Sequence, residues 1–286
     1  MKRRALIIGA SGLLAPALGR RLQEEGWLVR HTSRRGDVGL RVDLAELHGP
    51  VLPGDFDAVF FIAAETSLRR CEDDPAATHV VNVRSPAAMA NYFAARGAHI
   101  LTLSTNLVFD GTTAAAPAAL QRQPSCIYGK QKAELEDIFL ALGARATVLR
   151  ITKIVESLEK LTAGWADDLA AGRPIHPFSD LVCAPVSLAR VLDILVHAAG
   201  RRVAGMFQHS GDRDISYAEI ARVICRRMKL PEALVAPVRG ADLPVPPVAL
   251  PRHTTLAETL PAGFAPEEPE NASAVLAGFL DRRGTA

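Results

Sequence analysis

Two short stretches of the chain hold side chains suited to moving a proton. Ser104 and Thr105 stand at the end of an apolar run, and Tyr128 and Lys132 lie four residues apart in a helical pattern. Because positions i and i+4 share one face of a helix, the phenol and the ammonium should point the same way. A hydroxyl, a phenol and an ammonium form a plausible set for delivering a proton to a carbonyl oxygen.

The N-terminus has the pattern of a dinucleotide-binding unit. Apolar residues 5–8 predict a strand buried on both faces of a parallel sheet, and a helical pattern follows. The turn between them contains Gly9, Ser11, Gly12 and Leu13. Gly9 allows a tight turn, and Gly12 lets the backbone approach a pyrophosphate at the positive end of the helix. The alternative is a glycine turn that binds no ligand.

The end of the second predicted strand, residues 28–32, bears on the ribose of such a cofactor. A site that prefers NAD places a carboxylate here, whereas this chain has Arg34 and Arg35. Guanidinium groups bind a 2′-phosphate through charge-assisted hydrogen bonds, so the sequence predicts NADP(H) over NAD(H). The alternative is that both arginines lie in an ordinary solvated turn.

Further cofactor contacts are predicted at the same edge of the sheet. Asp43, followed by Leu44, is placed for a contact with the adenine amino group. The apolar strand predicted at 57–64 ends in Ala63 and Ala64, whose small side chains leave room at the carboxyl end of the strand. Ser104, Tyr128 and Lys132 are assigned to the cofactor site as well.

The order of these elements predicts an α/β fold, a Rossmann-type doubly wound parallel sheet with a smaller C-terminal α/β lobe. Residues 1–155 are predicted to form the NADP-binding domain, with about 180–205 returning to it. Residues 156–286 are predicted to be mainly a substrate-binding lobe. Residues 111–124, rich in Ala and Pro, are predicted to be a flexible loop over the mouth of the cleft.

Composition limits the classes of partner. The 286 residues are 49% hydrophobic and 22% charged, as in ordinary globular proteins. A net charge of +2 without a basic block argues against nucleic acid or an anionic membrane as an obligate partner. The four cysteines lack CxxC spacing, so neither a metal site nor a disulfide framework is predicted. The first apolar run is too short for a signal peptide or a membrane span, which favours the cytoplasm.

Four motifs stand in order along the first half: Gly9-Ala10-Ser11-Gly12-Leu13-Leu14, Ala63-Ala64-Glu65-Thr66, Ser104-Thr105-Asn106-Leu107-Val108-Phe109-Asp110-Gly111 and Tyr128-Gly129-Lys130-Gln131-Lys132. With them the chain resembles the extended short-chain dehydrogenase/reductases, and within these the dTDP-4-dehydrorhamnose reductase branch. The regulatory subunit of methionine adenosyltransferase shares this branch. The resemblance is strong over residues 5 to about 155 and weaker beyond.

The resemblance implies a role for each residue of the proton-transfer set. Tyr128 is the general acid, Thr105 orients the substrate oxygen, and Lys132 binds the nicotinamide ribose and lowers the pKa of the phenol toward neutrality. The implied activity is reduction of a keto group on a nucleotide-linked sugar, or a similar small carbonyl substrate, with NADP(H). A homodimer is implied by analogy with the superfamily.

The chain departs from the branch at Asn106 and Leu107, where its reductases usually have Asp-Tyr. Two alternatives stay open beside the reductase. One is a sugar-nucleotide epimerase or dehydratase, which ranks lower because Asn106 and Leu107 supply no acid–base pair beside Thr105. The other is a non-catalytic NADP-binding regulatory subunit that keeps the three residues without turnover.

Overall fold

Short apolar runs build the central sheet of the protein. The computed structural model describes residues 2–46, 54–266 and 268–282. The strands of the sheet are β1 (Arg4–Ile8), β2 (Leu28–Ser33), β3 (Leu40–Arg41), β4 (Ala58–Phe61), β5 (His99–Thr105), β6 (Ala146–Ile151) and β10 (Gly205–His209). All seven are parallel, in the order β10-β6-β5-β4-β1-β2-β3, so the order reverses beside β1. The carboxyl ends of β1, β4 and β5 therefore meet at one edge.

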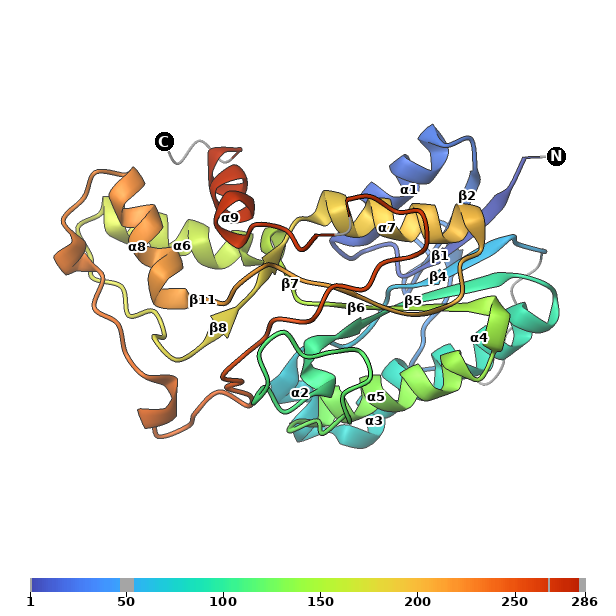
Figure 1. Cartoon of the computed structure of the whole chain (residues 1–286), viewed down its shortest axis with the longest axis horizontal. Coiled ribbons are helices and arrows are strands. Elements are labelled where there is room, and N and C mark those ends of the chain that lie inside the picture. Colours follow the sequence, from blue (N-terminus) through green and yellow to red (C-terminus); the bar gives the residue numbers. More distant parts are fainter. Residues whose placement is uncertain (1, 47–53, 267, 283–286) are drawn as a thin grey trace.

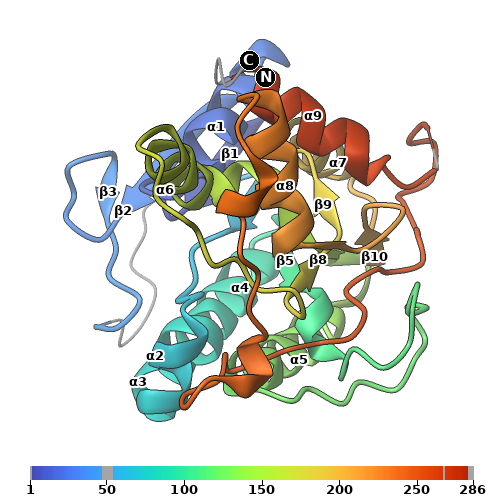
Figure 2. The same ribbon diagram turned by 90° about the vertical axis from the view of Figure 1, so that its left-hand side faces the viewer.

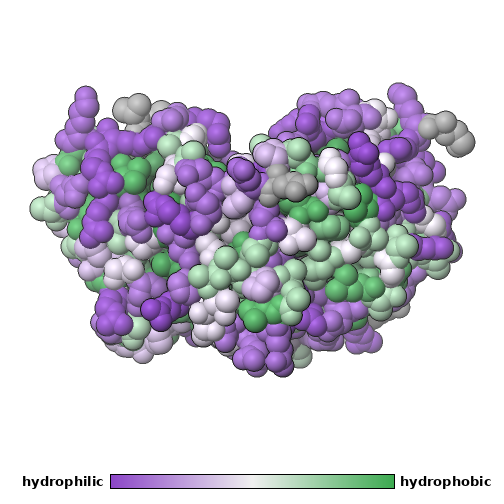
Figure 3. Space-filling model, viewed as in Figure 1, coloured by the Kyte–Doolittle hydropathy of each residue, from purple (hydrophilic) through white to green (hydrophobic). Residues whose placement is uncertain are grey.

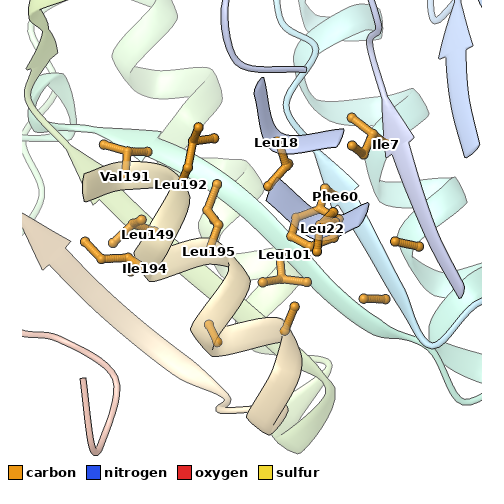
Figure 4. Packing of buried hydrophobic residues seen from close by; sticks show 14 of the residues in the cluster. Ile7, Leu18, Leu22, Phe60, Leu101, Leu149, Val191, Leu192, Ile194 and Leu195 are labelled. Carbon is orange, nitrogen blue, oxygen red and sulfur yellow. The ribbon is translucent and has the colours of Figure 1, made fainter. Parts of the chain in front are cut away.

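Helices cover both faces of this sheet (Figure 1). On one face lie α1 (Leu14–Glu24) and α7 (Leu188–Arg201), and on the other α4 (Ser85–Ala95) and α5 (Ile127–Leu140). Successive side chains of β1 point to opposite faces of the sheet. Ile7 packs against α1 and α7, whereas Leu6 and Ile8 pack against α4 and α5. Figure 4 shows the first of these cores, where Leu18 and Leu22 of α1 pack beside Leu192 and Leu195 of α7. The predicted doubly wound α/β fold is confirmed.

The segment between β4 and β5 is divided into four short helical elements. It comprises α2 (Leu68–Asp73), α3 (Pro75–His79), a π-helical turn η1 (Val80–Arg84) and then α4. Two of these helices begin at side-chain N-caps. Ser67 caps α2 by accepting from Arg70 N, and Asp74 caps α3 by accepting from Ala77 N.

A smaller group of elements stands beside the carboxyl edge of the sheet (Figure 2). It contains β7 (Lys153–Ile154), η4 (Val155–Leu158), α6 (Glu159–Ala170), β8 (Val182–Cys183), β9 (Pro185–Val186), β11 (Ile215–Ser216), α8 (Tyr217–Arg227), η5 (Glu232–Leu234), η6 (Gly240–Asp242) and α9 (Ala272–Asp281). An apolar core of its own joins α6, α8 and α9. We call this group the small lobe, and Figure 3 shows the surface indented between it and the sheet domain.

The predicted division of the chain near residue 155 stays a prediction, and the ends of its ranges, residues 1 and 283–286, lie outside the described residues. Within the second half, residues 188–209 lie in the sheet domain as α7 and β10. Helix α7 returns because its buried face, which includes Val191, Ile194 and Leu195, fits the apolar surface of the sheet. Among the described residues, no helix is both long and apolar enough to cross a membrane.

The predicted flexible loop at 111–124 is held in place instead. Gly111 O accepts from His253 N at 2.9 Å, and Ala116 exchanges backbone hydrogen bonds with Thr255 and Ala257. A small core of Val108, Phe109, Ala116 and Leu256 lies beneath it. Residues 118–122 of this segment line a cavity of about 670 Å³ beside α5. The lining of this cavity includes none of the proton-transfer residues. Composition without periodicity does not reveal such backbone pairing with a distant segment.

Candidate active site

The glycine turn after β1 is shaped to hold an anion. Gly9 has φ +107, and a Cβ added to it would lie 2.6 Å from the Cβ of Ala63, so only glycine fits there. Helix α1 begins at Leu14 without a side-chain cap, which leaves its first N–H groups available. Ser11 and Gly12 are exposed, and a Cβ on Gly12 would meet no atom within 4 Å. The turn is thus open at the positive end of the helix.

The arginines predicted to bind a phosphate lie in the loop after β2. Arg34 and Arg35 are both exposed. The loop is braced by Ser33, whose Oγ donates to Asp37 Oδ1 at 2.6 Å and whose carbonyl accepts from Val42 N at 2.9 Å. The hydroxyl of Ser33 lowers the pKa of Asp37, so a fixed carboxylate accompanies the two arginines. The sequence reasoning missed Asp37, because nothing in a turn composition marks which carboxylate folds back.

The remaining predicted cofactor residues line the same edge. Asp43 is partly exposed and its Oδ1 accepts from Ala45 N at 3.0 Å, whereas the side chain of Leu44 is buried in the core. Strand β4 ends at Phe61, earlier than the predicted 64, and Ala63 N then donates to Ile8 O at 3.0 Å. Ala63 and Ala64 are therefore in the turn that faces Gly9 rather than in the strand.

Strand β5 delivers two hydroxyls to this edge. Ser104 is 5% exposed, and its Oγ has no hydrogen-bond partner among the described residues. A buried hydroxyl without a partner is costly, so this atom marks a place where a ligand would complete the structure. Thr105 Oγ1 accepts from Leu107 N at 3.2 Å, which leaves its own O–H to donate.

Helix α5 brings the phenol and the ammonium against the end of β5. A Cβ added to Gly129 would lie 2.2 Å from Leu107 O, so this glycine lets the first turn of α5 pack closely on the turn 106–108. The same helix turn is capped by Cys126, whose Sγ accepts from Gly129 N at 3.4 Å. Helix α5, which carries Tyr128 and Lys132, thus packs on β5, the strand that carries Thr105, and on residues 106–108.

The pKa values of the pair differ from the expectation. Burial raises the pKa of the Tyr128 phenol, and the neighbouring Cys71 and Cys126 thiols add to the rise. Burial lowers the pKa of Lys132 from 10.5 to about 8. The direction for Tyr128 is opposite to the expected lowering, which stays a prediction for the complex with a cofactor.

Lys132 lies one helical turn from a buried ion pair that the sequence reasoning missed. Glu136 is 1% exposed and binds Arg150 of β6 through two bonds, of 2.8 Å to Nε and 2.7 Å to Nη2. Arg122 Nη1 donates to Glu136 Oε2 at 3.1 Å. The charge of Glu136 raises the pKa of Lys132 and so opposes the effect of burial. The i, i+4 spacing of Lys132 and Glu136 is a signal that could have found it.

A buried amide couples the turn after β4 to α5. Asn82 Oδ1 accepts from Glu65 N at 2.7 Å, and its Nδ2 donates to Glu65 O and to Gln131 Oε1 at 3.0 and 2.8 Å. Asn82 lies in the π-helical turn η1, which aims its side chain at both partners. A single polar residue inside the apolar run 80–83 was the available signal. Asn82 thus fixes the turn containing Ala63 and Ala64 relative to Lys132.

The predicted residues therefore form two neighbouring groups along one edge. Ser104 and Thr105 lie at the end of β5, and Tyr128 and Lys132 lie on the helix that packs against it. The glycine turn lies two strands away, against Ala63. Arg34 and Arg35 lie farther out, beyond β2. A glycine cradle, an uncapped helix and an unpartnered hydroxyl at a reversal of strand order fit a dinucleotide. The parallel sheet and the glycine turn define the class of dinucleotide-binding α/β proteins.

Comparison with known proteins narrows this class. The chain belongs to the family described as RmlD substrate binding domain, which matches residues 3–269, and the resemblance to the dTDP-4-dehydrorhamnose reductase branch is confirmed. It is 28% identical to methionine adenosyltransferase 2 subunit beta of Bos taurus over 278 residues, 89% of this chain and 80% of that protein. It is 29% identical to dTDP-4-dehydrorhamnose reductase of Mycolicibacterium smegmatis over 228 residues, 73% of this chain and 68% of that protein.

A solved structure supports the same fold. The dTDP-4-dehydrorhamnose reductase of Bacillus anthracis str. Ames, in complex with NADP, superposes with a TM-score of 0.80. The alignment covers 98% of this chain and 99% of that chain at 18% identity. Members of this family class bind NAD or NADP, and the chain shares their fold.

Proposed function

We propose that the protein is an NADP(H)-dependent reductase of a keto group on a sugar nucleotide or similar small carbonyl substrate. The observation that supports this most is the unpartnered hydroxyl of Ser104 at the carboxyl end of β5, the strand against which the helix carrying Tyr128 and Lys132 packs. A similar reductase from Mycolicibacterium smegmatis agrees with this reaction class.

The three side chains divide the work of carbonyl reduction. A nicotinamide cofactor, when bound at this edge, would supply hydride for the carbonyl carbon. Thr105 donates a hydrogen bond to the substrate oxygen, and Tyr128 gives that oxygen its proton. Lys132 would hold the nicotinamide ribose, and its ammonium would stabilise the phenolate that remains when Tyr128 has given up its proton. Reprotonation of Tyr128 from solvent completes the cycle.

The preference for NADP(H) is proposed on the charge of the loop after β2. Arg34 and Arg35 are exposed on a loop that Ser33 and Asp37 brace, so their guanidinium groups are available to a 2′-phosphate. The cofactor in the similar Bacillus anthracis structure is NADP. Asp43, Ala63, Ala64, Ser11, Gly12 and Leu13 are proposed to line the rest of the cofactor. A homodimer stays a prediction.

A second candidate is a cofactor-binding regulatory subunit without turnover. It is favoured by the 28% identity to methionine adenosyltransferase 2 subunit beta over most of both chains. Asn106 and Leu107 also stand where reductases of this branch usually have Asp-Tyr, which changes the side chains proposed to face the substrate. Burial raises the pKa of Tyr128, which makes the phenol a weaker acid. An epimerase or dehydratase of the same superfamily ranks third, because no carboxylate stands beside Thr105 in the 104–108 segment.

Two measurements on the same protein separate these candidates. Calorimetry of NADPH and NADH, on the wild type and on Arg34→Ala/Arg35→Ala, should show tight NADPH binding that falls to the NADH value in the variant. NADPH oxidation is then followed with a panel of keto-sugar nucleotides, with Tyr128→Phe as the matched inactive control. Binding without turnover on any of them would favour the regulatory subunit, and equal affinities for the two cofactors would refute the NADP preference.

A further inference from the structure

The chain crosses between the sheet domain and the small lobe several times, and three of the crossings meet at one buried side chain. Ser187 lies where the chain enters α7, His209 ends β10, and Glu270 precedes α9. The strand of the sheet domain that ends in His209 thus leads directly into the lobe. The backbone at this point also pairs with the third crossing, since Asp212 N donates to Glu270 O and Glu270 N to Ser210 O.

His209 is held between two carboxylates at this junction. Its side chain has no exposed surface. Nδ1 lies 2.8 Å from Glu258 Oε1 and Nε2 lies 3.1 Å from Glu270 Oε2. Because ionised carboxylates only accept hydrogen bonds, both ring nitrogens must carry a proton, and His209 is an imidazolium here. A neutral imidazole would leave one of these oxygens facing a ring nitrogen without a hydrogen.

The two carboxylates also accept hydrogen bonds from the chain at the other crossings. Glu258 Oε2 accepts from Ser210 N at 3.0 Å. Glu270 accepts from Ser187 N at 2.8 Å and from Ser187 Oγ at 2.7 Å, at the start of α7. The next amide of α7, Leu188 N, donates to Glu156 of η4 at 3.0 Å. The N-terminus of α7 thus receives carboxylates from two other crossings, which its positive end favours.

We propose that His209 is a positioning residue, a protonated clasp that fixes the small lobe on the sheet domain, and that loss of its proton loosens this junction. The clasp does not depend on the proposed reaction, because it acts on the joint between the two parts. Its effect on substrate binding rests on the proposed function, because a loosened small lobe would cover the carboxyl edge of the sheet less closely.

The direction of the pH effect follows from the groups that face His209. Burial alone would lower its pKa, but the hydrogen bonds and charges of Glu258 and Glu270 outweigh burial and raise it. Glu156, paired with Arg282 at 3.0 Å, is the further charged pair at the start of α7. The clasp is therefore fully formed below the ordinary histidine value of about 6.5 and is lost as pH rises through the raised value.

Hydrogen exchange on the full chain tests this proposal without any ligand. Peptides covering 205–215 and 255–272 are followed from pH 6 to pH 9, with rates corrected for intrinsic exchange. In the wild type the equilibrium constant for opening of the junction should rise by up to about tenfold per pH unit above pH 6.5. The rise should stop above the pH at which His209 loses its proton in the closed junction. In His209→Gln these peptides should exchange faster at pH 6 and show no such rise.

Two further variants make the result specific. His79→Gln removes a histidine that pairs with Glu134 on the surface, and it should behave as the wild type. Glu258→Gln keeps an oxygen for Nδ1 but removes a charge, so its rise in exchange should end at a lower pH and be smaller in total. A wild type without the rise, or a His209→Gln protein that retains it, would overturn the clasp. If His209→Gln does not fold, an unshifted Glu258→Gln profile does the same.

The same variants link the clasp to catalysis once a substrate is found. The KM for the sugar nucleotide should rise with pH in the wild type at the pH where exchange rises, whereas kcat should not follow it. A protein without turnover leaves the exchange result standing, so failure of the proposed reaction and failure of the clasp are distinguishable.

Discussion

Replacing Glu136 by Gln should destabilise the protein strongly and also shift the titration of Lys132. The substitution leaves the Arg150 guanidinium, 3% exposed, without its carboxylate. Breaking a buried ion pair by removing one partner typically costs about 3–5 kcal/mol. Arg150 keeps Gln208 Oε1 and Ala118 O, each at 3.1 Å, and stays over the Phe109 ring. We therefore expect the lower value, about 3 kcal/mol.

Urea unfolding of Glu136→Gln against the wild type measures this loss. The matched control is Glu134→Gln, on the same helix, whose carboxylate pairs with His79 at the surface. An exposed pair contributes at most about 1 kcal/mol, so the control should be nearly neutral. Because the charge of Glu136 raises the pKa of Lys132, its loss should also lower that pKa below about 8. A destabilisation no larger than that of the control would refute the reasoning.

Two other substitutions test the helix that carries Tyr128. Because burial lowers the pKa of Lys132 from 10.5 to about 8, its charge destabilises the fold by about 3 kcal/mol below pH 8, and the penalty shrinks as pH rises toward 10.5. Lys132→Met should thus be more stable than the wild type in denaturant at pH 7, with a gain that fades by pH 10; a gain that grows with pH would contradict this. In Gly129→Ala the new Cβ, 2.2 Å from Leu107 O, forces a shift of roughly 1 Å that should lower kcat about a hundredfold, although Ala favours the helix. Steady-state kinetics measures it, and unchanged kcat would show that the turn yields instead.

The sequence could predict the parts of the molecule that follow from local pattern. The run 5–8 is apolar throughout because both faces of β1 are covered, and the glycine turn follows it directly. The pair Tyr128 and Lys132 was predictable because both lie on one face of one helix. In each case the physical cause lies within a few residues of the chain.

The missed features depend on contacts between distant residues. Glu136 and Arg150 are 14 residues apart, Asn82 and Gln131 are 49 apart, and His209 meets Glu270 from 61 residues away. Their residue types alone fit a solvated surface equally well. The direction of the Tyr128 pKa could not be read from the sequence for a related reason, since it depends on how much water the assembled fold removes from the phenol.

The return of α7 to the sheet has a consequence for how the protein is made. The core beneath α1 and α7 joins residues from Ala5 to Phe264, although α1 and five of the sheet strands precede residue 106. As the ribosome extends the chain from its N-terminus, those strands emerge long before Val191 and Leu195 can cover them. The nascent sheet therefore exposes an apolar face until more than two thirds of the chain has been synthesised, and the first half depends on the second to complete its fold.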